Sequence, residues 1–314
     1  MLNPAKLRGI IIPIVTPVTP AQAVDKEALR RLVRYVLAGG VQGIFVMGGT
    51  GNFCSFTAEE RFQVARAVVE EVGGRVPVLV GAMDSSTRLV IRRVQDAVKA
   101  GADAVVVEPP FYYPCTEEDV LAHYRAVAEA SEVPIVIYNI PPANKVNIDI
   151  HLTRKLADIP KIVAMKDSTS DFVFFQELLA TFGGSPFQII QGQEPLAGSS
   201  FLLGADGGIL AIGNVVPKLC VDLFEAGKKG DLETTRELQA QLMTAFSIVR
   251  HYADSGDGSG YYTSTVGSFF AGLHCALKIL GIAEGVLTVP YAQPSASDYA
   301  RVRDVLMRLE LVPA

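Results

Sequence analysis

Two residues of this sequence, Lys166 and Tyr138, have side chains that together can form and break an imine with a carbonyl compound. Lys166 ends the apolar run Lys161–Lys166, and Tyr138 ends the apolar run Pro134–Tyr138. Burial among apolar side chains disfavours the charged form of an amine, so more nucleophilic free base is present. A neighbouring phenol can accept and return the protons that imine formation requires. The pair therefore predicts Schiff-base chemistry, and the alternative is a lysine whose amine reaches solvent at a strand end.

The runs that carry these side chains belong to a longer repeating pattern. Short β-branched runs alternate with amphipathic segments eight times, which is typical of parallel strands joined by helices. We therefore predict an α/β fold, a (β/α)8 TIM barrel with a C-terminal three-helix extension. The expected strands are Gly9–Val15, Gly43–Met47, Val76–Val80, Ala104–Glu108, Pro134–Tyr138, Lys161–Lys166, Phe187–Gln191 and Gly208–Ile212. The expected helices begin near Asp25, Thr57, Ser85, Thr116, Asp149, Thr169, Glu194 and Pro217.

Beyond about residue 229 the strand pattern stops and helical periodicity continues. We expect a catalytic barrel over residues 1–228 and a helical extension packed on it over residues 229–314. The run Asp254–Gly260 is similar to a calcium loop but lacks the closing glutamate and the expected spacing, so a flexible turn is predicted there. The three helices expected in the extension are Asp231–Tyr252, Ser259–Leu280 and Ser295–Leu311.

Composition and charge favour small-molecule chemistry. The net charge is −5 and basic residues form no run longer than a pair, so we expect no nucleic-acid partner and no acidic membrane partner. No apolar run reaches the length of a membrane span, and prolines interrupt the apolar N-terminal stretch that imitates a signal peptide. The four scattered cysteines fit a reducing compartment, so a cytoplasmic location is expected.

A metal centre or a bound nucleotide cofactor is not expected. A metal-dependent aldolase needs clustered histidine and carboxylate ligands at strand ends. No glycine-rich nucleotide loop follows the first strand, where the chain reads Thr16–Pro20. We therefore predict no metal and no cofactor beyond the covalent imine with the substrate. The histidines are expected within helices or at helix starts, as packing or surface residues: His123, His151, His251 and His274.

In barrels of this kind the reactive groups project from the C-terminal ends of the strands. Because side chains alternate along a strand, Tyr138 shares a face with Val136, and Lys166 shares a face with Ala164, so both functional groups can point inward. The turn Gly48–Gly51 offers successive backbone N–H groups and a threonine hydroxyl, which can hold a carboxylate. The alternative for that turn is an ordinary tight strand-to-helix connection.

Three segments resemble one known family. Gly48–Gly51, Tyr138–Pro141 and Ile162–Asp167 are similar to motifs of the dihydrodipicolinate synthase and N-acetylneuraminate lyase family of class I aldolases. The resemblance extends from the first strand through the C-terminal helices, and a Tyr-Asn-x-Pro element with a lysine 28 positions after its tyrosine is specific. It implies that Lys166 forms the Schiff base with a 2-oxo acid and that Tyr138 shuttles protons.

The same resemblance implies the rest of the site. Tyr112 matches a loop tyrosine that reaches into a neighbouring subunit, which implies a homodimer or homotetramer. Gly49 and Thr50 are expected to hold the substrate carboxylate. The predicted catalytic residues are Lys166, Tyr138 and Tyr112, and the predicted substrate-binding residues are Gly49, Thr50, Gly51, Gln193, Glu194 and Ile209.

This chain departs from the family pattern at positions that bear on the substrate. The family usually has Ser or Thr at the position of Gly49 and Glu at that of Asn52, so the hydroxyl that links the two tyrosines in the synthase is missing. Ala143 stands where the synthase has a carboxylate-binding arginine, and Lys145 nearby lacks its bidentate fork.

These departures favour a lyase, aldolase or dehydratase that acts on pyruvate or a hydroxylated 2-oxo acid, with Gln193 and Glu194 binding substrate hydroxyls. One alternative is dihydrodipicolinate synthase activity, which condenses pyruvate with aspartate semialdehyde. A second is a barrel that binds a 2-oxo acid without catalysis, because a fold alone does not assign chemistry.

Overall fold

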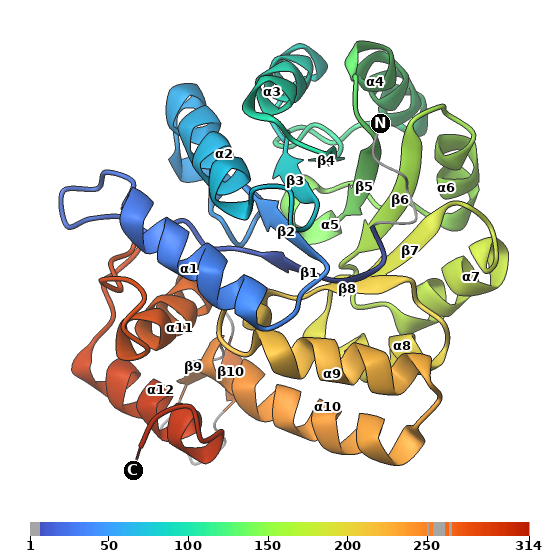
Figure 1. The fold of residues 1–314 in the computed structure, drawn as a ribbon. Helices are drawn as coiled ribbons and strands as arrows, with labels where there is room; N and C mark the ends of the chain where they lie inside the picture. Colours follow the sequence, from blue (N-terminus) through green and yellow to red (C-terminus); the bar gives the residue numbers. More distant parts are fainter. Residues whose placement is uncertain (1–6, 250, 254–260, 264–265, 314) are drawn as a thin grey trace.

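The computed structural model describes residues 7–249, 251–253, 261–263 and 266–313. In this part of the chain eight parallel strands close into a barrel in sequence order, with helices around it (Figure 1). The predicted (β/α)8 barrel is therefore confirmed. The strands are β1 (Gly9–Pro13), β2 (Gly43–Val46), β3 (Val78–Gly81), β4 (Ala104–Val107), β5 (Ile135–Asn139), β6 (Ile162–Asp167), β7 (Gln188–Gln191) and β8 (Gly207–Ile209).

Helices cover the barrel, and several of them begin at a polar residue whose side chain caps the first turn. Thr57 opens α2 with a capping box that Glu60 completes, and Thr116 opens α4 in the same way with Asp119. The connecting helices are α1 (Lys26–Ala38), α2 (Ala58–Val72), α3 (Thr87–Ala100), α4 (Glu117–Ala130), α5 (Pro141–Asn144), α6 (Ile150–Ala157), α7 (Phe172–Phe182), α8 (Ala197–Leu202) and α9 (Pro217–Lys228). Three short 3-10 turns lie among them, η2 (Phe53–Ser55), η3 (Glu194–Leu196) and η4 (Ala211–Asn214).

Three helices follow the barrel, as predicted: α10 (Leu232–Phe246), α11 (Val266–Ile279) and α12 (Ala296–Arg308). They lie together below α1 and α9 in Figure 1, with α10 alongside α9. The amide of Asn52, in the loop after β2, donates to the hydroxyl of Thr288 over 2.6 Å. The segment between α11 and α12 therefore contacts the carboxyl-terminal face of the barrel, where the candidate site lies.

Two boundaries of the C-terminal extension differ from the sequence prediction. The first expected helix continues to Tyr252, but α10 ends at Phe246 and is followed by the 3-10 turn η5 (Ser247–Val249). His251–Ala253 form strand β9, which pairs antiparallel with β10 (Tyr261–Thr263). His251 is therefore in a strand, which fits the β propensity of the aromatic and β-branched residues in both segments. The second expected helix begins at Val266 as α11, and the run 254–260 lies outside the described residues.

Strands one and eight are shorter than predicted because polar side chains bind the backbone where each strand was expected to continue. The expected eighth strand runs to Ile212, but β8 ends at Ile209 and η4 follows. The Asn214 amide group accepts a hydrogen bond from the Val15 N–H over 3.0 Å and donates to the Ala211 carbonyl over 2.8 Å. Asn214 thus replaces the strand ladder with side-chain contacts at this point of the barrel.

Candidate active site

Lys166 and Tyr138 lie side by side at the carboxyl ends of β6 and β5. The two residues are register partners in the parallel pairing of these strands, so their side chains share one face of the sheet. The Lys166 Nζ lies 3.8 Å from the centroid of the Tyr138 ring and 5.8 Å from that of Phe45. Only 5% of Lys166 is exposed. The structure therefore brings the two predicted catalytic residues together in an apolar setting.

Burial changes the protonation of both groups. It lowers the pKa of Lys166 to about 7, although the carboxyl groups of Glu194, Glu108 and Asp167 act in the opposite direction. Burial and the nearby Glu108 carboxyl raise the pKa of the Tyr138 phenol above its usual range. At neutral pH a substantial fraction of Lys166 is free base, and Tyr138 is a protonated donor.

The turn after β2 approaches the phenol from the other side. Gly49 is exposed, and a Cβ atom added to it would lie 3.9 Å from the Tyr138 hydroxyl, which is an ordinary van der Waals contact. The Gly51 carbonyl accepts a hydrogen bond from the Thr16 hydroxyl over 2.9 Å, and the Asn52 N–H donates to the Gly49 carbonyl over 2.9 Å. These contacts fix the backbone of the turn that we expect to hold a carboxylate.

Strand seven leads into two more of the predicted residues. The Glu194 side chain is buried, its Oε1 accepts from the Ile212 N–H over 3.0 Å, and burial raises its pKa. Gln193 is half-buried and donates from Nε2 to the Ser168 carbonyl over 2.9 Å. Ile209 is buried at the end of β8. Of these residues, Glu194 is the one whose carboxyl group interacts electrostatically with the Lys166 amine, and this interaction raises the pKa of Lys166.

Tyr112 lies apart from the buried pair. It is 70% exposed on the loop after β4, and its ring packs edge-on against Tyr113 with centroids 4.9 Å apart. The Lys145 amine donates to the Tyr112 carbonyl over 3.3 Å and lies 5.9 Å from its ring centroid. Lys145 therefore contacts this loop, and Ala143 lies exposed in α5.

Sequence reasoning noted Glu108 at a strand end but gave it no role. In the structure it is 3% exposed, and its Oε2 accepts a hydrogen bond from the Asn144 Nδ2 over 3.4 Å. Burial raises the pKa of Glu108 to about 7, against the opposing effects of Asn144 and Lys166. The sequence feature that could have indicated this role is a carboxylate, Glu108, at the end of an apolar run that precedes the strand of Tyr138.

A second set of missed contacts fixes the ends of β5 and β6. The Asn139 amide donates to the Asp167 carboxylate over 3.1 Å and to the Ile148 carbonyl over 3.3 Å, and the Thr169 hydroxyl donates to Asp167 over 2.9 Å. Asn139 and Asp167 directly follow Tyr138 and Lys166 in β5 and β6, so their side chains lie on the outer face, and their contacts hold the inner pair in position. The buried Ser168 hydroxyl lies near the Tyr138 phenol and lowers its pKa.

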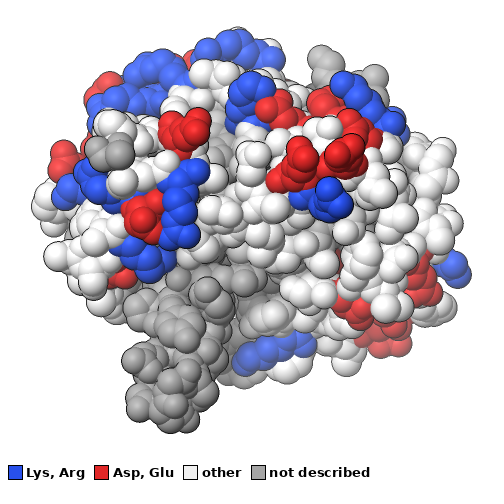
Figure 2. All heavy atoms as spheres, turned by 90° about the horizontal axis from the view of Figure 1, so that it is seen from below, with Lys and Arg blue, Asp and Glu red and all other residues white. Residues whose placement is uncertain are grey.

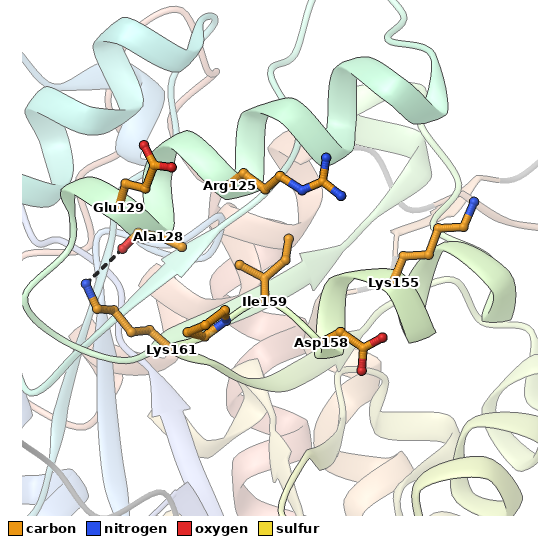
Figure 3. A pocket seen from close by; sticks show the side chains of 8 residues that line it. Arg125, Ala128, Glu129, Lys155, Asp158, Ile159 and Lys161 are labelled. Carbon is orange, nitrogen blue, oxygen red and sulfur yellow. Dashed lines mark hydrogen bonds between the residues drawn. The ribbon is translucent and has the colours of Figure 1, made fainter.

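A pocket of about 570 Å³ lies between α4 and the start of β6, at the opposite end of the strand from Lys166. Figure 3 shows the Lys161 amine directed at the Ala128 carbonyl, to which it donates over 2.9 Å, and it also donates to the Ser131 carbonyl over 2.6 Å. Lys161 is therefore a structural contact at the barrel's amino-terminal end. The lining residues are Arg125, Ala128, Glu129, Lys155, Asp158, Ile159, Pro160 and Lys161.

The described residues also bear on metal sites and membrane spans. They contain no group of three His, Cys, Asp or Glu side chains that could hold a metal ion, and no helix among them is long and apolar enough to cross a membrane. On the face drawn in Figure 2, acidic and basic side chains are interspersed. That face offers no single-sign surface to a polyanion.

Comparison with known proteins adds the following findings. Residues 6–308 match the model of the dihydrodipicolinate synthetase family. An uncharacterised DapA-like lyase of Halobacterium salinarum is 31% identical over 310 residues, covering 99% of this chain and 96% of the relative. The structure of dihydrodipicolinate synthase from Bacteroides thetaiotaomicron superimposes with a TM-score of 0.88 at 31% identity, over 98% of this chain and 100% of that one. A prophage protein from E. coli K12, solved in complex with pyruvate, gives a TM-score of 0.86 at 27% identity, over 97% and 99%.

Proposed function

This chain belongs to the dihydrodipicolinate synthetase family of lyases, and from that premise we propose that Lys166 forms a Schiff base with pyruvate or a hydroxylated 2-oxo acid. The observation that carries the proposal is the buried Lys166 amine, 3.8 Å from the Tyr138 ring centroid. Its pKa of about 7 supplies free base for attack on a ketone. The imine is formed with the substrate itself, so the reaction needs no separate cofactor.

The residues around the amine take roles that follow from their positions. The Lys166 amine adds to the C2 carbonyl, and the C2 oxygen takes one proton from the amine nitrogen and one from the Tyr138 phenol. That oxygen leaves as water, and the protonated imine remains. The turn Gly49–Gly51 holds the substrate carboxylate through its backbone N–H groups and the Thr50 hydroxyl. The protonated imine then accepts electrons during C–C cleavage or loss of water. Gln193 and Glu194 bind hydroxyl groups further along the substrate.

Reduction with borohydride in the presence of pyruvate tests this proposal. A reduced pyruvate adduct on Lys166, located by intact mass and peptide mapping, is the expected result. Lys166→Ala should give no adduct, whereas Lys155→Ala, which removes an exposed lysine on α6, should leave the adduct unchanged. A folded wild-type protein that forms no adduct with any 2-oxo acid would instead support a barrel that binds without catalysis.

A second candidate function is condensation of pyruvate with aspartate semialdehyde. It is favoured by the similarity to dihydrodipicolinate synthase from Bacteroides thetaiotaomicron. We rank it below a lyase because Ala143 offers no positive charge to a second carboxylate, and the nearby Lys145 amine already binds the Tyr112 carbonyl. A mass-based screen of sugar-derived 2-oxo acids alongside pyruvate plus the semialdehyde decides between the two. A high rate of condensation would reverse the ranking.

The assembly and the location of the protein are also proposals. Tyr112 and Tyr113 are 70% and 75% exposed on one loop, which is unusual for aromatic side chains and typical of interface residues. We infer that this loop meets a second copy of the chain in a homodimer or a homotetramer. Four free cysteines and small-molecule chemistry support a cytoplasmic enzyme.

A further inference from the structure

The carboxyl group of Glu108 is close enough to Lys166 and Tyr138 to act on the charges of both groups. Val107 of β4 is the register partner of Ile137 of β5, so the next residues along, Glu108 and Tyr138, are neighbours on the same face of the barrel wall. Tyr138 is in turn the register partner of Lys166. Three groups that can exchange protons therefore lie in one row across the ends of three adjacent strands.

Glu108 is buried but only weakly hydrogen-bonded. Among the described residues, its carboxyl group accepts one hydrogen bond, the 3.4 Å contact from Asn144. Asn144 is itself held, because its Oδ1 accepts from the Val146 N–H over 3.0 Å. A carboxylate that accepts two or three hydrogen bonds is held in its ionised form. The Glu108 carboxylate, which accepts one long hydrogen bond, can still take up a proton. Its pKa of about 7, raised by burial, agrees with that geometry.

We propose that Glu108 is the base that removes the proton from C3 of the Lys166 Schiff base, an inference that rests on the proposed function. The C3–H bond breaks, its electron pair becomes the C2=C3 double bond of an enamine, and the iminium nitrogen becomes neutral. The proton goes to the Glu108 carboxylate. Return of that proton to C3 reverses the step, so atoms and charge balance without a further reactant.

The neighbouring charges assign this step to Glu108 rather than to Tyr138. Once the Tyr138 phenol has regained from solvent the proton that it gave to the C2 oxygen, it keeps that proton at neutral pH, because burial and Glu108 both disfavour the phenolate. The iminium is a fixed positive charge, whereas the free Lys166 amine is only partly protonated. Formation of the iminium therefore favours the ionised carboxylate when a base is needed. Tyr138 then handles protons at the C2 oxygen, and Glu108 handles the proton at C3.

Exchange of the pyruvate methyl protons in D2O tests the assignment without a second substrate. Proton NMR follows the loss of the methyl signal, and borohydride trapping measures the imine in the same samples. Glu108→Gln keeps the size of the side chain but cannot accept the proton. We expect it to keep the Lys166 adduct and to slow exchange by roughly 10²–10⁴-fold, as for loss of a general base. Glu118→Gln, on the exposed side of α4, should change neither measurement.

The two assays separate the possible failures. Exchange at the wild-type rate in Glu108→Gln, with the adduct present, overturns the proposal. Loss of the adduct in this variant alone also overturns it, because Glu108 would then serve imine formation. Absence of an adduct in the wild-type protein rejects the proposed function instead. If Glu108→Gln does not fold, Glu108→Asp withdraws the carboxylate by one methylene, and slower exchange with an intact adduct is then the expected result.

Discussion

In the proposed reaction the Tyr138 phenol donates a proton, and it is protonated beside a Lys166 amine that is only partly protonated. Burial raises its pKa while lowering that of Lys166. We predict that Tyr138→Phe lowers kcat/KM and the rate of borohydride trapping by roughly 10²–10⁴-fold, the usual cost of removing an acid–base group. Tyr113→Phe, which removes an exposed hydroxyl, should retain the wild-type values. An unchanged rate in Tyr138→Phe would mean that another group supplies the proton.

Ionisation of the Glu108 carboxyl group lowers the stability of the folded protein. Its pKa in the folded protein, about 7, exceeds the ordinary value of 4.5. A raised pKa of an acid gives stability below the ordinary value, and this stability is lost as the pH rises through the folded pKa. The groups near it are Lys166, Tyr138, Tyr124, Cys54 and Asn144, of which only Lys166 offsets a negative charge.

Glu108→Gln should therefore gain free energy of unfolding relative to the wild type as the pH rises from 4 to 8. The change should be on the order of 3 kcal/mol, from about 1.4 kcal/mol for each of the 7 − 4.5 = 2.5 units of pKa difference. Urea unfolding at several pH values measures it, with Glu118→Gln, at an exposed position of α4, as the matched control. If the difference in free energy of unfolding between Glu108→Gln and the wild type did not change with pH, burial would not be keeping Glu108 protonated.

At the scale of elements, the ends of β6 and β7 approach each other closely at Gly192. A Cβ atom there would lie 2.6 Å from the Asp167 carbonyl oxygen and 3.0 Å from the Lys166 Cε. Backbone cannot give way as a flexible side chain can, so the strand end must move. We predict that Gly192→Ala destabilises the protein by about 1–3 kcal/mol and lowers the yield of the Lys166 adduct. Gly49→Ala meets no such contact, so a loss of stability there equal to that of Gly192→Ala would contradict this account.

The element scale also explains which features could be predicted from the sequence. The two-residue period of a strand fixes the faces of Tyr138 and Lys166, and the alternation of runs fixes the barrel. The end of β8 depends on Asn214 reaching Val15, a contact between distant segments that no local pattern contains. The burial of Glu108 likewise depends on the register between β4 and β5, which appears only when the barrel closes.

At the scale of the whole molecule, the exposed loop of Tyr112 raises the question of which subunit's site it serves. If Tyr112 completes the site of a neighbouring chain, Lys166→Ala and Tyr112→Ala each remove a different component of that shared site. In a mixed dimer, one site then keeps an intact Lys166 from one chain and an intact Tyr112 from the other. If the Tyr112 loop forms a subunit interface, it therefore determines the activity of the enzyme as well as the mass of the assembly.

We predict that the two inactive variants regain activity when mixed and allowed to exchange subunits. Random pairing gives up to roughly a quarter of the wild-type activity, because half of the dimers are mixed and each holds one complete site. Mixing Lys166→Ala with Tyr138→Phe should restore nothing, since both residues belong to the same chain's site. Light scattering reports the assembly in each sample. Failure of the first mixture, with exchange demonstrated by mass, would mean that Tyr112 does not act on a neighbouring site.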